Sequence, residues 1–115
     1  MDSTSEEKRQ HPRIAILRPL VYQSDSYPKT RRAFTRDLSL GGAGIQSVSP
    51  LSSQERLNLW FSFQPRVIPC TGRVVHVRQV GNRFHVGISF ESMADEDRMA
   101  LTQYVSDLMK EKGQD

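Results

Sequence analysis

The sequence predicts a mainly β protein: an antiparallel β-barrel of about six strands, with a C-terminal α-helix packing at one opening and a flexible N-terminal arm. Three observations lead to this fold class. Short segments in which apolar and polar residues alternate recur along the chain, with turn-forming residues between them. One segment of helical periodicity follows them near the C-terminus. A run of polar residues precedes the first strand.

Six segments have the pattern of β-strands. A succession of short strands favours a closed barrel, because closure leaves no strand edge unpaired. The clearest pattern lies between residues 57 and 63, where four large apolar residues alternate with Asn58, Trp60 and Ser62. The predicted strands cover residues 14–22, 30–36, 43–48, 57–63, 73–80 and 84–90.

Turn and breaker residues separate these strands. Proline has no amide hydrogen to donate, so Pro19 places the first strand at a sheet edge or a bulge. Residues 37–42 are predicted to form the loop between the second and third strands. Gln64-Pro65 ends the fourth strand, and Gly81-Asn82 predicts the turn of a hairpin between the last two.

The C-terminal segment has a helical pattern from about residue 94 to residue 112. Its buried stripe is predicted to cover one opening of the barrel. The residues that recur at intervals of three and four are Ala94, Arg98, Leu101, Val105, Leu108 and Met109.

The chain is predicted to form one domain. A length of 115 residues suits a single modest core, which we place in residues 9–115, including the helix. Residues 1–8 contain no Ala, Val, Ile or Leu. Because such a segment buries too little apolar surface to offset the entropy of ordering, residues 1–8 are predicted to be a disordered tail.

The positive charge of the chain is concentrated near its N-terminus. Residues 1–36 contain 8 Lys and Arg against 4 Asp and Glu, whereas residues 37–115 contain 8 against 9. A basic region of this kind attracts phosphate groups. The charge distribution by itself fits either an anionic ligand bound at the N-terminal third or a solvated positive face without a partner.

The composition argues against several classes of protein. No apolar run approaches the length of a membrane-spanning helix, and the N-terminus lacks the apolar region of a secretory signal, so we expect a cytoplasmic protein without membrane insertion. One cysteine, Cys70, excludes an internal disulfide and is interpreted as a small apolar strand residue. The histidines have no metal-binding spacing, and no metal site or cofactor is expected. His11, Asp37 and Ser39 lack the context of a catalytic triad, so we predict no enzymatic activity.

Two short motifs lie on either side of the first two predicted strands. The first has two arginines four residues apart, Arg9 and Arg13, and the second has the pattern Asp37-x-Ser39-x-x-Gly42. Each motif alone is common. Their order, and the 24 residues from Arg13 to Asp37, make the pair more specific, because this separation accommodates one strand and a return.

The pair RxxxR and DxSxxG resembles the ligand-binding signature of the PilZ family. The resemblance covers roughly residues 9 to 90. It implies binding of the bacterial second messenger cyclic dimeric GMP (cyclic di-GMP). The residues that it implies as ligand contacts are Arg9, Arg13, Asp37, Ser39 and Gly42, with Lys8, Gly41, His76 and Arg78 as further candidates.

The chemistry of these residues suits a ligand with two phosphodiesters and two guanines. Arginine donates paired hydrogen bonds to phosphate or to guanine O6 and N7, and its plane stacks on rings. Asp37 can accept from guanine N1 and N2, Ser39 can donate a hydroxyl hydrogen, and Gly41 and Gly42 permit positive φ angles and close backbone approach. Lys8 stands where some family members carry another arginine, which leaves open whether one messenger or a stacked pair binds.

The predicted function is that of a receptor and adaptor. The ligand would order the N-terminal arm, and an unidentified effector protein would bind the altered surface, because the chain has no room for a second domain. Two alternatives stay open. One is a single-stranded nucleic-acid-binding barrel that uses Arg31, Arg32 and Arg36 with Trp60 and Phe61, although the low aromatic content makes nucleic acid an unfavoured partner. The other is a protein-interaction module that needs no ligand.

Overall fold

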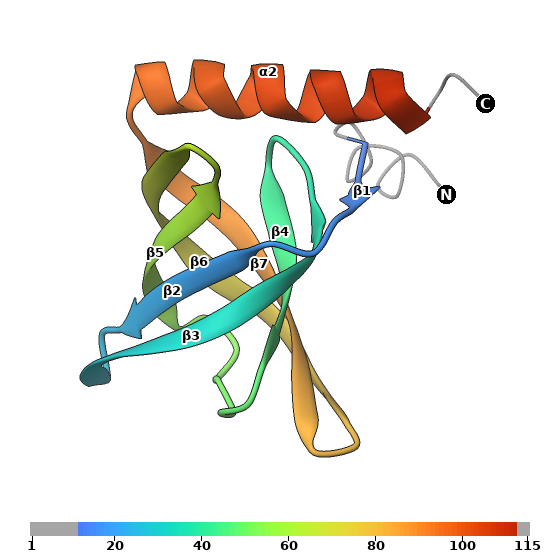
Figure 1. Cartoon of the computed structure of the whole chain (residues 1–115). Helices are drawn as coiled ribbons and strands as arrows, with labels where there is room; N and C mark the ends of the chain where they lie inside the picture. The colour runs from blue at the N-terminus through green and yellow to red at the C-terminus, as the bar shows by residue number, and fades with distance from the viewer. Residues whose placement is uncertain (1–11, 113–115) are drawn as a thin grey trace, which may run out of the picture.

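The computed structural model describes residues 12–112 as a closed antiparallel barrel of six strands with one helix across an opening (Figure 1). This architecture confirms the predicted fold class. A further two-residue strand, β1, continues the line of β2 along β3. The elements are β1 (Ile14–Ala15), β2 (Pro19–Ser24), β3 (Tyr27–Leu38), β4 (Gly42–Ser47), β5 (Arg56–Phe63), β6 (Arg66–Val80), β7 (Arg83–Met93) and α2 (Asp95–Lys112).

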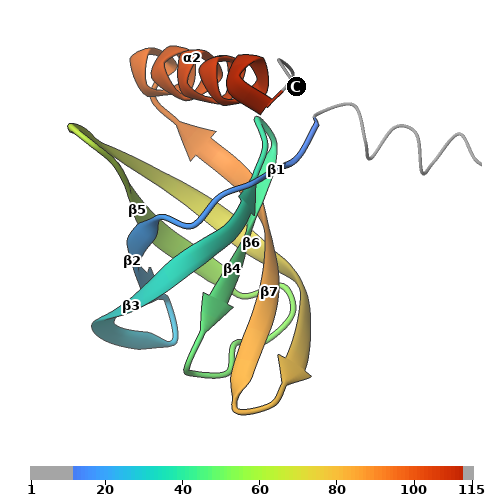
Figure 2. The same cartoon turned by 45° about the vertical axis from the view of Figure 1, so that its right-hand side comes forward.

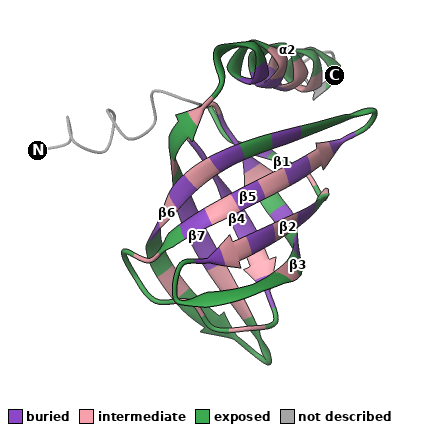
Figure 3. Ribbon diagram, turned by 90° about the vertical axis from the view of Figure 1, so that its left-hand side faces the viewer, coloured by how far each residue is buried: buried purple, intermediate pink, exposed green. Residues whose placement is uncertain are grey.

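The barrel closes through β3. Around the barrel the strands follow the order β3, β2, β5, β6, β7, β4, and β4 pairs with β3 again. The four apolar residues predicted for one face of β5 are all at most 4% exposed, and buried and exposed residues alternate along the strands (Figure 3). Burying each such side chain contributes about 1.5–3 kcal/mol. The alternation read from the sequence therefore defines the inside of the barrel.

Helix α2 lies across one end of the barrel, as predicted (Figures 1 and 2). Its residues Leu101 and Val105 are buried, and the ring of its Tyr104 stacks on Phe63 of β5 with 4.5 Å between centroids. The predicted stripe was wrong at three positions. Ala94 and Arg98 are exposed and Met109 is 41% exposed, whereas Tyr104, which the stripe did not include, is partly buried.

The first predicted strand is interrupted. Residues 16–18 leave the β-ladder but stay bonded to β3 by two backbone hydrogen bonds, from the Ile16 amide to the Arg36 carbonyl and from the Thr35 amide to the Arg18 carbonyl, and by the hydroxyl of Thr35. Its Oγ1 accepts from the Arg18 amide at 2.8 Å and donates to the Ile16 carbonyl at 2.5 Å. Pro19 is then the first residue of β2, a position that proline tolerates. The sequence predicted a sheet edge or a bulge for Pro19, and the edge was wrong, because β2 lies between β3 and β5.

Strand β6 begins at Arg66, seven residues before the predicted start. Pro69 and Gly72 obscured the strand pattern of this segment. Pro69 pairs with Trp60 of β5, whereas the pairing of β6 with β7 starts only at Cys70. The proline therefore lies where β6 has a neighbour on one side alone, a position at which strands tolerate a residue without an amide hydrogen.

Candidate ligand-binding site

One row of residues runs across the outer face of four neighbouring strands. Asp37 of β3 pairs with Gly44 of β4, Gly44 pairs with Gly87 of β7, and Gly87 pairs with His76 of β6. The two central positions of this row have no side chain. Neighbouring side chains cover the backbone there: the Asp37 carboxylate lies over Gly44 and the His76 imidazole lies over Gly87.

Asp37 is held by two hydrogen bonds to its Oδ1 atom. The guanidinium of Arg13 donates at 2.7 Å and the amide of Gly44 donates at 3.0 Å. A Cβ at position 44 would stand 2.8 Å from Asp37 Oδ2, so the carboxylate lies over β4 only because residue 44 is glycine. Within residues 12–112, Asp37 Oδ2 accepts no hydrogen bond. This oxygen can accept from a ligand.

The predicted loop at residues 37–42 is shorter than expected. Asp37 and Leu38 end β3 and Gly42 begins β4, so the turn consists of residues 39–41. Ser39 is buried, and its hydroxyl donates to the Gly42 carbonyl at 3.3 Å and accepts from the Gly41 amide at 3.2 Å. Ser39 thus shapes the turn, which brings the Gly41 and Gly42 backbone to the site.

The positive φ angles expected at Gly41 and Gly42 are absent. Neither Gly41 nor Gly42 has a positive φ, which among the glycines of residues 12–112 occurs only at Gly81 in the β6–β7 turn. Close approach does require Gly42: a Cβ there would lie 2.1 Å from the carbonyl oxygen of Ile88 in β7. Glycine at this position lets β4 and β7 pair beside the turn.

A cavity of about 690 Å³ opens between this turn and β6. The structure brings five of the nine predicted residues to its wall, and Asp37 adjoins them through its bond to Arg13. Arg78 lies two residues beyond His76 on β6 and does not line the cavity; Lys8, Arg9, His11 and the predicted 1–8 tail lie outside the described residues. The lining residues are Arg13, Ser39, Gly41, Gly42, Val75, His76, Ile88 and Ser89.

His76 and Gly87 form a flat part of the site. A Cβ at position 87 would lie 2.2 Å from Cε1 of the His76 ring, so the imidazole rests on the backbone of β7. His76 is otherwise exposed, and its ring is open to contact with a planar group. The sequence analysis included His76 but missed Gly87 and Gly44. A glycine inside a strand pattern indicates close approach of another group, and this signal was present at both positions.

Four further observations concern metal binding, membrane insertion, the cysteine and nucleic-acid binding. Residues 12–112 hold no cluster of His, Cys, Asp or Glu that could bind a metal ion, and none of their helices is long and apolar enough to cross a bilayer. Burial raises the pKa of the Cys70 thiol to about 12, so this cysteine is unreactive. The nucleic-acid alternative loses one stacking residue, because Phe61 is only 1% exposed in the core.

The family model of the PilZ domain matches residues 7–107. The chain belongs to the PilZ domain family. This membership confirms the resemblance inferred from the two motifs. No curated protein sequence matches the chain.

Solved structures of PilZ proteins share the fold. The PilZ domain of YcgR from Escherichia coli, determined with c-di-GMP, is 19% identical with a TM-score of 0.74, over 91% of this chain and 94% of that one. The MrkH–c-di-GMP complex of K. pneumonia is 17% identical with a TM-score of 0.80, over 91% and 54%.

The Bacillus subtilis inhibitor of motility MotI/DgrA is also similar, at 20% identity with a TM-score of 0.76, over 90% of this chain and 51% of that one. The PilZ chain described here thus spans about half the length of MotI/DgrA and MrkH. At these identities the similarity establishes the shared barrel.

Proposed function

We propose that this PilZ domain protein is a receptor for cyclic di-GMP. The observation that carries the proposal is the cavity of about 690 Å³ that Arg13, the turn at residues 39–42 and His76 enclose, with the Asp37 carboxylate beside it. The cavity and its edge bring together a cation, an anion, the backbone of a turn and a flat ring. These are the groups that a ligand with phosphodiesters and guanines needs.

Arg13 and Asp37 have complementary roles in this proposal. Within residues 12–112, Arg13 uses one of its five donors, on Asp37, and its side chain is 56% exposed. The remaining donors can bind a phosphate or guanine O6 and N7. Asp37 Oδ2 can accept from the N1 and N2 hydrogens of the same guanine. The bond between the two residues orients each of them toward the ligand.

The turn and His76 supply the other contacts. The hydroxyl of Ser39 fixes the turn and its side chain lines the cavity, so we assign it a positioning role with a ligand contact in addition. Gly41 and Gly42 offer close backbone approach. The His76 ring, supported by the backbone at Gly87, can stack on the second base.

The N-terminal arm completes the site in this proposal. Arg9 and Lys8 lie four and five residues before Arg13 in the sequence, and their charges would reach the phosphates of the same ligand. Binding would restrict the arm to one conformation, and an effector protein would recognise the altered surface. The chain therefore acts as a cytoplasmic adaptor, with binding in place of catalysis.

Calorimetric titration with cyclic di-GMP tests the proposal directly. The expected result is saturable heat, with affinity reduced by about 1–3 kcal/mol in Arg13→Ala and in Arg9→Ala, the range for a lost hydrogen bond to a charged group. Amide NMR spectra should shift at residues 39–42 and 76. Absence of heat at tens of micromolar messenger, together with unchanged spectra, would refute the assigned ligand.

A further inference from the structure

A β-bulge at Arg36 places two neighbouring residues of β3 at two different surface hollows. The pairing of β3 with β4 shifts register between Thr35 and Asp37, so Arg36 has no opposite residue in β4. A bulge of this kind turns consecutive side chains to the same face. Arg36 is exposed and Asp37 half-buried, whereas Thr35 is fully buried. Asp37 belongs to the ligand site, and Arg36 lines a second hollow.

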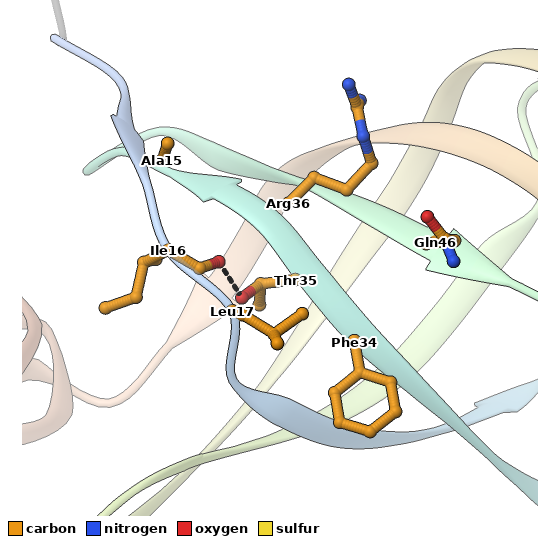
Figure 4. Close-up of a pocket in the computed structure, with 7 residues that line it drawn as sticks. All are labelled: Ala15, Ile16, Leu17, Phe34, Thr35, Arg36 and Gln46. Atoms are coloured by element: carbon orange, nitrogen blue, oxygen red, sulfur yellow. Dashed lines mark hydrogen bonds between the residues drawn. The ribbon is translucent and has the colours of Figure 1, made fainter.

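This second hollow is a groove of about 400 Å³ beside the interrupted strand (Figure 4). Two large apolar side chains stand exposed in its wall: Leu17 is 68% exposed and Phe34 is 49% exposed. Adjoining apolar side chains left open to water are typical of an interaction site. The groove is lined by Ala15, Ile16, Leu17, Phe34, Thr35, Arg36 and Gln46.

The surface that continues from Gln46 of the groove across β7 and β6 is basic. On the outer face Phe34 pairs with Gln46, Gln46 with His85, and His85 with Arg78. Partial burial, and after it the charges of Arg36 and Arg78, lower the pKa of His85, which places both cations near that ring. Neither arginine forms a salt bridge with a residue of the described chain. The surface is thus apolar at one end and positive at the other.

We propose that this groove docks an acidic segment of a partner protein. An aliphatic or aromatic side chain of the partner packs on Leu17 and Phe34, and neighbouring carboxylates pair with Arg36 and Arg78. Charge complementarity selects this occupant. A second copy of the chain would bring the same cations together across a two-fold axis, where they repel each other.

The groove adjoins the proposed ligand site through two segments. Leu17 lies four residues after Arg13, with β1 between them, and Arg36 precedes Asp37. Movement of either segment by a ligand would reshape the groove, which links partner binding to the messenger. That link rests on the proposed function, whereas the groove and its occupant do not.

A random peptide library displayed on phage and selected on the full chain, without messenger, tests the docking site. Enriched peptides are expected to combine an aliphatic or aromatic residue with adjacent acidic residues. Their dissociation constants, from fluorescence anisotropy, should rise at least about tenfold, equivalent to about 1.4 kcal/mol, in Leu17→Ser and in Arg36→Glu.

Matched controls lie elsewhere on the surface. Met99 of α2 is 73% exposed and Arg98 of the same helix is exposed, so Met99→Ser and Arg98→Glu should leave the peptide affinity within about twofold. Phe34→Ser serves as a second groove variant, and circular dichroism verifies the fold of each.

Several outcomes would overturn the docking site. The selection could enrich no peptide, or it could enrich basic peptides. The groove variants and the control variants could bind the peptides with equal affinity, or the chain could form a concentration-dependent dimer that Leu17→Ser abolishes.

Calorimetry of Leu17→Ser with cyclic di-GMP separates the two proposals. Failure of the messenger to bind would leave the peptide result standing, and normal messenger binding without peptide enrichment would remove the groove alone.

Discussion

The substitution Asp37→Asn separates the role of the Asp37 carboxylate in ligand binding from its role in stability. Asparagine keeps the shape of the side chain, and its amide oxygen can still accept the Gly44 hydrogen bond of 3.0 Å. The negative charge 2.7 Å from the Arg13 guanidinium is lost. If the assigned roles are right, affinity for cyclic di-GMP falls far more than stability.

The expected magnitudes follow from exposure. The side chains of Arg13 and Asp37 are 56% and 24% exposed, and pairs of this kind contribute about 0.2–1 kcal/mol to folding. The loss corresponds to a melting temperature lower by at most about 4–8 °C. A lost hydrogen bond between a charged group and the ligand costs about 1.5–3 kcal/mol, which weakens binding by about 10- to 150-fold.

Glu91→Gln is the matched control for this experiment. Glu91 is a surface carboxylate, 32% exposed, that accepts from Arg73 at 2.7 Å and does not line the cavity. Its replacement should lower stability by a similar amount and leave messenger affinity within about twofold. Calorimetric titration and differential scanning calorimetry of both variants measure the two quantities. Equal loss of affinity in the two variants, or no loss in Asp37→Asn, would refute the reasoning.

Three further predictions concern the barrel itself. In Gly42→Ala the new Cβ would stand 2.1 Å from the Ile88 carbonyl oxygen, so the free energy of unfolding in urea should fall by about 1–3 kcal/mol or more; unchanged stability would contradict the described pairing. Burial acts to raise the pKa of Glu55, but hydrogen bonds from Ser24, Ser52 and Ser26 outweigh it and lower the pKa from 4.5. Since the folded-state pKa lies below the unfolded one, this stabilisation is present above pH 4.5 and lost as the pH falls through the folded value, so Glu55→Gln should destabilise the protein at pH 7 and progressively less on acidification. The buried Cys70 thiol, with its pKa of about 12, should resist iodoacetamide at pH 8 until denaturant is added, and rapid labelling of the native protein would count against its placement.

The elements that the sequence predicted well are those whose pattern is local. Alternation from Leu57 to Phe63 identified β5, and Gly81-Asn82 identified the hairpin turn between β6 and β7. The prediction failed where a tertiary contact overrides the local pattern. Thr35, which is distant in sequence from residues 16–18, bonds to the interruption of the first strand. Strand β6 includes Pro69 because the pairing of β6 with β7 starts only at Cys70.

In the candidate site, too, local sequence motifs predicted some residues and strand pairing determined the others. The two motifs pointed to Arg13, Asp37, Ser39 and Gly42, because the chemistry of a ligand-binding side chain is a property of the residue type. The row from Asp37 to His76 depends on the pairing of four strands. A sequence pattern carries no register between strands far apart in the chain, so Gly44 and Gly87 could not be assigned to the site beforehand.

The sequence by itself determined that the protein is a strand-rich domain with a terminal helix, and which of its residues resemble a nucleotide-binding signature. Side-chain periodicity and residue chemistry are enough for both. Only the tertiary structure decided where those residues meet, that Ser39 shapes a turn, and that a bulge at Arg36 opens a second surface beside the first. Each of these depends on which backbone groups pair across the closed barrel, and that pairing exists only when all six strands are in place.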